Sequence, residues 1–226
     1  MNTRTPLFVS FAVVAAMLAI SAWAWLHLPP GTSVPIHWNA DGQPDGFARG
    51  PFALFMAPAM TALVALLFWV VPKLEPRRLN IAASAKFYRA VWIGVILLLA
   101  AAHGASLYTV LHAGVNVSNV VLAAVCLLII VVGNYLGKTR SMFLAGVRTP
   151  WTLTSEYSWQ RTHSLAGKLF IAAGAVGFAA AIALPAQQAT HIFLYALGGA
   201  VAVSVIASYV YWRRDPLRHT GDGVPE

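Results

Sequence analysis

Residues 134–168 read NYLGKTRSMFLAGVRTPWTLTSEYSWQRTHSLAGK, a polar segment between two long apolar runs. This segment gathers five lysines and arginines together with Trp151, Trp159 and His163. Connections in compact domains are usually short, and long ones are commonly functional. We therefore expect the segment to be folded and to contact a substrate or a partner.

The composition of the whole chain is that of a membrane protein. Its 226 residues are 59% hydrophobic and only 10% charged, whereas soluble domains carry about 25% charged residues. A bilayer-spanning helix needs about 20 mostly apolar residues. Six such runs lie at about residues 6–28, 52–71, 90–111, 120–136, 169–184 and 192–212. The prediction is an all-α polytopic membrane protein, a six-helix transmembrane bundle with one structured loop on each side of the bilayer.

The distribution of lysine and arginine predicts the orientation of these spans, because cytoplasmic loops keep the excess of positive charge. With the N-terminus inside, the internal segments hold 14 of the 15 lysines and arginines, and the external loops hold only Arg49. Both termini are therefore expected in the cytoplasm of a bacterial cell with an inner membrane. Residues 29–51 would lie outside and residues 134–168 inside. The net charge of +8 then reflects topology and contact with membrane lipids, not nucleic-acid binding.

Several familiar chemistries have no support in the sequence. The one cysteine, Cys126, lies in an apolar run, so it allows neither an intramolecular disulfide nor a thiolate metal cluster. The chain has no HExxH, GxSxG, Walker-type or CxxC motif, and no cofactor or metal is expected. His103 is the one ionisable residue well inside a span, and it is either a hydrogen-bonded packing residue or a site residue.

Small residues spaced four apart predict where helices touch. Gly133 and Gly137 form a GxxxG pattern at the end of the fourth span, and Ala173, Gly177 and Ala181 repeat along the fifth. Such spacing lets helix backbones approach closely. The fourth and fifth spans are expected to pack as a hairpin with the polar segment at its tip, and dimerisation through the same glycines is the alternative.

The polar segment contains the candidate cytoplasmic site. The chain before Pro150 is expected to be extended, and Thr154 or Ser155 is expected to cap a helix that continues into the fifth span. Trp159 and His163 share one face of that helix. The alternative is an interfacial helix that only contacts lipid headgroups. The predicted site residues are Asn134, Lys138, Arg140, Arg148, Thr149, Pro150, Trp151, Glu156, Trp159, Arg161 and His163.

The external segment at residues 29–51 reads PPGTSVPIHWNADGQPDGFARGP. It has too much proline and glycine for a helix and no strand alternation, and its Asn, Asp and Gly residues favour turns. A compact recognition loop is therefore predicted. Its side chains suggest recognition of a ligand or, as an alternative, ligation of a cation. The candidate residues are His37, Trp38, Asn39, Asp41, Pro44 and Asp45.

Two motifs resemble known families. VPIHWNADGQPDGF resembles the signature of a domain of uncharacterised function that often precedes SdpI-type modules. GNYLGKTRSMFLAGVRTPWTL, followed by SEYSWQRTHSLAGKLF, closely resembles the SdpI family, which is named for the immunity protein of a bacterial sporulation-delaying toxin. The expected organisation is a two-span module at residues 1–80, a four-span SdpI-like module at residues 81–215 and a flexible cytoplasmic tail at residues 216–226.

This resemblance implies a non-enzymatic role in immunity and signalling. The family prototype protects its cell from a secreted antimicrobial peptide toxin and also holds a small transcriptional repressor at the membrane. On this chain, the outer loop and the spans would meet the peptide. The basic inner segments around Arg140, Arg148 and Arg161 would hold the soluble partner, an assignment that rests on their predicted side of the membrane.

Two other functions remain open from the residues alone. A membrane-embedded hydrolase acting on lipid or peptide would use His163 with Glu156 as acid and base, joined by His103 if the helices converge. A small transporter is the other possibility, although no Asp or Glu lies within a predicted span, and proton-coupled carriers usually depend on such carboxylates. The oligomeric state is not predicted.

Overall fold

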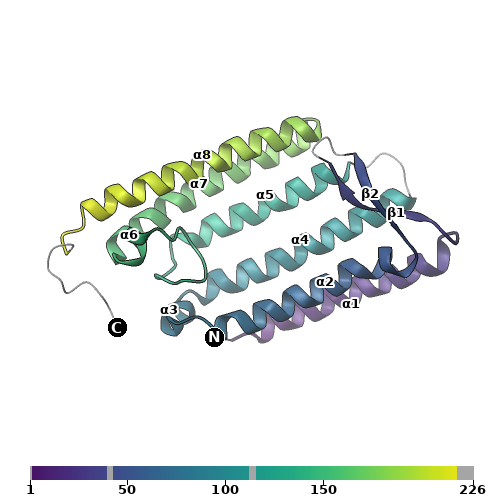
Figure 1. The fold of residues 1–226 in the computed structure, drawn as a ribbon, viewed down its shortest axis with the longest axis horizontal. Coiled ribbons are helices and arrows are strands. Elements are labelled where there is room, and N and C mark those ends of the chain that lie inside the picture. The colour runs from purple at the N-terminus through teal and green to yellow at the C-terminus, as the bar shows by residue number, and fades with distance from the viewer. Residues whose placement is uncertain (1, 40–42, 112–115, 218–226) are drawn as a thin grey trace.

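Six long helices lie side by side in the computed structural model, which describes residues 2–39, 43–111 and 116–217 (Figure 1). Each is long and apolar enough to cross a membrane, which confirms the predicted all-α, six-span architecture. Residues 218–226 of the predicted tail lie outside the described residues. The long helices are α1 (Arg4–His27), α2 (Gly50–Val70), α4 (Ala85–Leu111), α5 (Val117–Leu136), α7 (Glu156–Ala183) and α8 (Ala186–Arg213).

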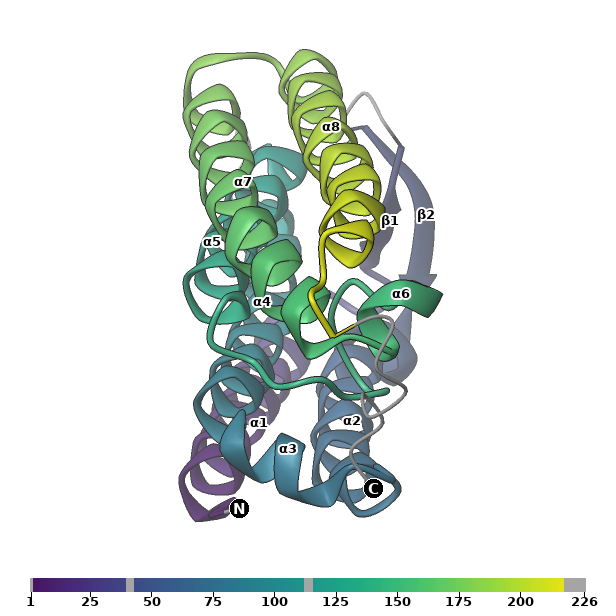
Figure 2. The same cartoon turned by 90° about the vertical axis from the view of Figure 1, so that its left-hand side faces the viewer.

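The bundle has two different ends. At one end lie the strands β1 (Ser33–Trp38) and β2 (Pro44–Arg49), and we call this end the hairpin face (Figure 1). At the other end lie the start of α1, the end of α8 and three short elements, and we call it the terminal face (Figure 2). The short elements are η1 (Val71–Lys73), α3 (Arg78–Ala83) and α6 (Pro150–Leu153). Which face is cytoplasmic stays a prediction.

Helix α4 joins two groups of helices, because it packs against α1 and α2 as well as against α5, while α7 packs against α5 and α8. A buried cluster near the terminal face combines Ala65 of α2 and Trp92 of α4 with Met142 and with Trp159 of α7. The core therefore crosses the predicted module boundary near residue 80, and the division into two modules stays a prediction.

Helices α5 and α7 approach through glycine. A Cβ atom on Gly133 would lie 2.6 Å from the carbonyl oxygen of Gly167, and a Cβ atom on Gly167 would lie 2.6 Å from the carbonyl oxygen of Gly133. A Cβ atom on Gly137 would lie 3.1 Å from the Cα atom of Ser164. Only glycine, which has no side chain, allows two helix backbones to approach this closely. The GxxxG pattern thus mediates a contact between two helices of the same chain, as predicted for the fourth and fifth spans.

The prediction that residues 29–51 lack strands was wrong. They form an antiparallel β-hairpin in which Val34 pairs with Ala48 and Pro35 with Phe47, with irregular register between Pro35 and Trp38. These irregularities interrupt the period-2 alternation by which a strand is recognised in sequence. Prolines are tolerated because both strands of a two-stranded sheet are edge strands. The hydroxyl of Ser106 donates a hydrogen bond to the Pro35 carbonyl oxygen at 2.6 Å and fastens the hairpin to α4.

Candidate functional site

Two chain segments distant in sequence, residues 71–84 and 137–155, close the terminal face together. The Arg77 guanidinium donates hydrogen bonds to the Ser141 hydroxyl and, at 3.2 Å, to the Leu153 carbonyl oxygen. It also lies 4.8 Å from the centre of the Phe143 ring. The Asn80 side-chain amide donates to the Ser141 carbonyl oxygen at 2.7 Å. A planar, always charged guanidinium suits such a multiple contact, and the polar loop is therefore held in a defined shape.

Glu75 is a buried carboxylate in this closure, with 3% of its surface exposed. Its Oε1 accepts hydrogen bonds from the backbone N–H groups of Arg77 at 3.1 Å and Phe143 at 3.2 Å. A buried charged group requires such partners. Glu75, Arg77 and Asn80 were not among the residues predicted from the sequence. The available signal was one carboxylate inside a segment rich in lysine and arginine.

Trp159 and His163 form a buried stacked pair, with ring centres 3.9 Å apart and neither side chain exposed. The backbone N–H of Val147 donates to His163 Nε2 at 2.9 Å, so this nitrogen carries no proton. His163 Nδ1 then donates to the Trp159 carbonyl oxygen at 2.8 Å. The indole N–H of Trp159 donates to the Thr139 carbonyl oxygen at 3.1 Å. Thr139 and Val147 are therefore both bonded to this pair, which fixes the two ends of the loop between them.

Gly146 covers this pair. Its φ angle is +116°, in the region that L side chains rarely adopt, and a Cβ atom there would lie 2.4 Å from His163 Nε2. The same atom would lie 3.0 Å from the Trp159 ring. The glycine is thus required both by its backbone conformation and by the contact.

The turn that precedes α7 has the predicted form. Helix α6 begins at Pro150, and Thr149 is extended and forms a capping box with Thr152. Ser155 caps α7 by accepting a hydrogen bond from the Ser158 N–H, and its hydroxyl donates to Asp215 Oδ2 at 2.5 Å. The Trp151 indole donates to the Ser208 hydroxyl of α8. The turn is therefore docked on the last helix.

The predicted cytoplasmic site separates into a buried frame and an exposed charged surface. Trp159 and His163 are buried, and Thr149, Trp151 and Glu156 are partly buried. The exposed members are Asn134, Lys138, Arg140, Arg148, Pro150 and Arg161. Glu156 does not orient His163, because both imidazole nitrogens are occupied by backbone groups. The acid–base pair of the hydrolase hypothesis is thus wrong.

His103 belongs to a separate network. It is 5% exposed, and its Nε2 lies 3.1 Å from the Ser21 hydroxyl, which donates to the Leu54 carbonyl oxygen at 2.7 Å. The residue joins α1, α2 and α4 as a packing residue. Helices α4 and α7 both begin at the terminal face. At a rise of about 1.5 Å per residue, His103 lies about 27 Å from the start of α4, whereas His163 lies only about 10 Å from the start of α7. The two histidines do not form a common site.

The hairpin face carries the other predicted site. His37 Nδ1 lies 2.5 Å from Asp45 Oδ1, and both side chains are exposed. Asn39 Oδ1 accepts a hydrogen bond from the Gln43 N–H at 3.0 Å. Asp41 lies outside the described residues. Within the described ranges no three His, Cys, Asp or Glu side chains form a group suited to a metal ion.

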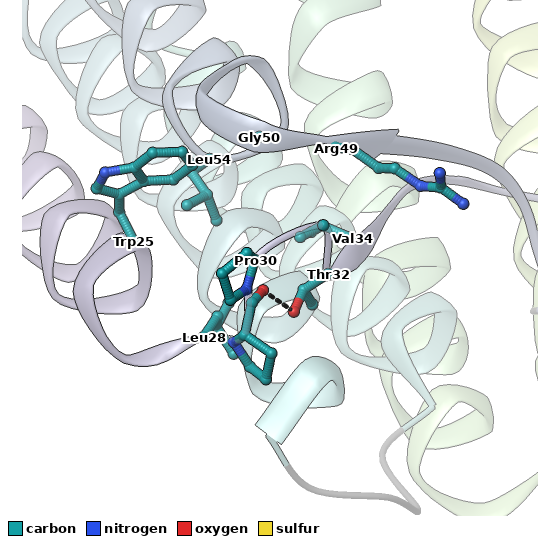
Figure 3. Close-up of a pocket in the computed structure, with 10 residues that line it drawn as sticks. Trp25, Leu28, Pro30, Thr32, Val34, Arg49, Gly50 and Leu54 are labelled. Carbon is teal, nitrogen blue, oxygen red and sulfur yellow. Dashed lines mark hydrogen bonds between the residues drawn. The ribbon is translucent and has the colours of Figure 1, made fainter.

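Two cavities flank the hairpin. One of about 580 Å³ lies between the hairpin and the end of α4 and is lined by Trp38, Pro44, Phe47 and Val110 among others. The other, of about 440 Å³, lies between the hairpin and the ends of α1 and α2 (Figure 3). Its walls are mostly apolar, and Arg49 is the one charged residue among them. They include Trp25, Leu28, Pro30, Val34 and Leu54. The hairpin therefore has a mostly apolar recess on one side and a recess with mixed polar and apolar walls on the other.

Comparison with known proteins agrees with the two motifs in the sequence. The model of the SdpI/YfhL protein family matches residues 138–211, which include the polar loop, α6, α7 and most of α8. Residues 138–211 therefore resemble an SdpI/YfhL family domain. A second model, described as a domain of unknown function (DUF1648), matches residues 12–62 and includes the hairpin. The resemblance to both families is confirmed.

The similarity of this chain to a known protein also extends beyond the SdpI/YfhL match. Immunity protein SdpI of Bacillus subtilis (strain 168) is 23% identical over 209 residues, covering 91% of this chain and 95% of that protein. No solved structure matches the chain. The six long apolar helices and this similarity together support a multi-pass membrane protein that resembles Immunity protein SdpI along nearly its whole length.

Proposed function

We propose that this chain is a membrane immunity protein that protects the cell producing it from a secreted antimicrobial peptide. The observation that carries the proposal is the similarity to Immunity protein SdpI along nearly the full length of both chains. The hairpin and the SdpI/YfhL domain thus occur together, as they would in a protein with the same task. The hairpin face would meet the peptide, because 14 of the 15 lysines and arginines favour the opposite side as cytoplasmic.

The hairpin has the properties of a recognition surface. Phe47 is 56% exposed and Trp38 partly exposed, and both line the cavity of about 580 Å³. Aromatic side chains that pack into pockets at a protein interface often dominate its binding energy. Because Ser106 fastens the hairpin to α4, this surface is held in place before a peptide arrives.

The proposal is tested by survival. The full-length chain, expressed in a bacterium sensitive to peptide toxins of the sporulation-delaying class, is expected to raise the toxin concentration needed for killing. Cells with the empty vector are the control, and detection of the protein in the membrane fraction confirms expression. Unchanged killing by every toxin of this class, with the protein present in the membrane, would contradict the proposal.

The hairpin aromatics should matter specifically. Trp38→Ala and Phe47→Ala are each expected to reduce protection by about tenfold or more, since a buried aromatic anchor contributes about 2 kcal/mol. Phe8→Ala is the matched control, because Phe8 is 72% exposed but lies near the terminal face in α1. Membrane levels of all three variants are measured alongside toxin sensitivity. Equal protection by the hairpin variants and Phe8→Ala would exclude the hairpin as the contact surface.

The terminal face supports a second role, retention of a soluble repressor protein. Its cations Arg140, Arg148 and Arg161 are exposed, whereas Glu75 is buried and Glu156 partly buried. An acidic surface on a partner would complement this charge. Affinity purification with and without toxin tests the role. Recovery of a soluble DNA-binding protein only with toxin supports retention, and its equal recovery from Arg148→Gln/Arg161→Gln would contradict the assignment to these cations.

A further inference from the structure

A basic cavity opens on the terminal face and does not include Arg140, Arg148 or Arg161, although Lys138 of the predicted cytoplasmic site lines it. It has a volume of about 430 Å³ and lies where α3 ends, α4 begins and α5 ends. Three cations line it, two from the first turns of α4 and one just after α5. The residues used below are Ala82, Ser84, Lys86, Arg89, Tyr135 and Lys138.

The cations of this cavity form no ion pair within the described part of the chain. No acidic residue lines the cavity, and no ion pair joins Lys86, Arg89 or Lys138 to a carboxylate in the described ranges. Arg89 uses only its Nε, which donates to the Ala85 carbonyl oxygen at 3.3 Å, and Lys138 lies 5.4 Å from the Tyr135 ring. Three positive charges around a recess favour an anion, and the N-terminal end of α4 adds a favourable partial charge.

The position of the cavity indicates where the anion comes from. Helix α4 begins at Ala85 and α5 ends at Leu136, and these are also the ends of two candidate membrane spans. The cavity therefore lies at the level of lipid headgroups. Leu79 on the neighbouring α3 is 86% exposed. A leucine so exposed beside a basic recess is typical of a surface that rests on lipid, with its apolar side chain among the acyl chains.

We propose that this cavity binds the phosphate group of an anionic phospholipid, with Lys86, Arg89 and Lys138 around the headgroup and Leu79 against the lipid chain. The bound lipid would join the start of α4 to the end of α5. Ser84 extends this connection, because its hydroxyl accepts a hydrogen bond from the Arg140 N–H of the polar loop at 3.0 Å. The inference is independent of toxin immunity.

The four lysines of the chain provide a matched test. Native mass spectrometry of the full-length protein in detergent compares phosphatidylglycerol with phosphatidylcholine of identical acyl chains. The wild type is expected to prefer phosphatidylglycerol. Lys86→Gln/Lys138→Gln should reduce that preference by about 25-fold, at roughly fivefold for each of the two cations near the membrane surface. The control Lys73→Gln/Lys168→Gln removes the same charge from two exposed lysines outside the cavity and should keep the preference.

A second variant keeps the test independent of the lysines. Ala82 lines the cavity and is exposed, so Ala82→Glu adds a negative charge and is also expected to abolish the preference. Equal binding of both lipids by the wild type would overturn the proposal. So would an equal loss in the two lysine pairs, which would show unspecific attraction. Displacement of the lipid by an excess of inorganic phosphate would assign the cavity to a soluble anion instead.

Discussion

Gly133→Ala is expected to force α5 and α7 apart and to destabilise the bundle by about 3 kcal/mol. The added methyl group would lie 2.6 Å from the Gly167 carbonyl oxygen and 3.0 Å from the Ile171 N atom. These are backbone atoms, so no change of rotamer relieves the overlap. Overpacking of a tight interior costs about 1–3 kcal/mol, and in a membrane the close helix contact is itself the main source of association.

The single cysteine reports this effect. Cys126 of α5 is fully buried, and its thiol lies where a Cβ atom on Gly177 of α7 would meet it. A thiol-reactive fluorescent dye therefore follows thermal unfolding of the detergent-solubilised protein. The control is Gly104→Ala, because a Cβ atom on this helical glycine of α4 meets nothing within 4 Å. That variant is expected to be neutral or more stable by about 0.5–1 kcal/mol. Equal melting temperatures of Gly133→Ala and Gly104→Ala would contradict the close packing of α5 against α7 at Gly133.

Gly146→Ala is expected to release the polar loop of the terminal face, at a cost of about 3–5 kcal/mol. The alanine would keep a φ of +116° with difficulty, and its methyl group would lie 2.4 Å from His163 Nε2. Backbone strain of this kind costs about 1–3 kcal/mol, and overpacking adds a similar amount. If the loop moves instead, the hydrogen bond from the Val147 N–H to His163 is lost.

Gly31→Ala separates the two causes. Gly31 has a φ of +80°, but a Cβ atom there meets nothing within 4 Å, so alanine at this position introduces backbone strain alone. The expected order of melting temperature is wild type, then Gly31→Ala, then Gly146→Ala. Limited proteolysis should cut Gly146→Ala within residues 139–155 and leave Gly31→Ala intact there. Equal stability of the two variants would show that His163 and Gly146 do not form the described contact.

Local sequence signals predicted most of the membrane architecture. Apolar runs predicted six spans, Pro150 predicted the extended chain before it, and Ser155 was one of two residues predicted to cap α7. Each of these features depends on residues that are close in sequence. The hairpin escaped prediction because its irregular register hides the alternation of β1 and β2.

The closure of the terminal face could not be predicted in the same way. Arg77 donates hydrogen bonds to Ser141 and Leu153, which are 64 and 76 residues away in the sequence. No local sequence pattern predicts a contact over such a separation. The residue types of the polar segment were correctly singled out, but their division into buried frame and exposed surface depends on packing. His163 illustrates this, since an imidazole in a polar segment resembles a catalytic group until both its nitrogens are seen to be bonded to backbone.

Thiol labelling in whole cells tests the placement of the hairpin face outside and the terminal face inside most directly. Cys126 is fully buried, so the background is low, and Ser33→Cys and Thr154→Cys introduce near-isosteric thiols at exposed positions on the two faces. A membrane-impermeant maleimide is expected to label Ser33→Cys in intact cells and Thr154→Cys only after permeabilisation. Labelling of Thr154→Cys in intact cells, with Ser33→Cys protected, would place the hairpin in the cytoplasm and contradict its role in meeting a secreted peptide.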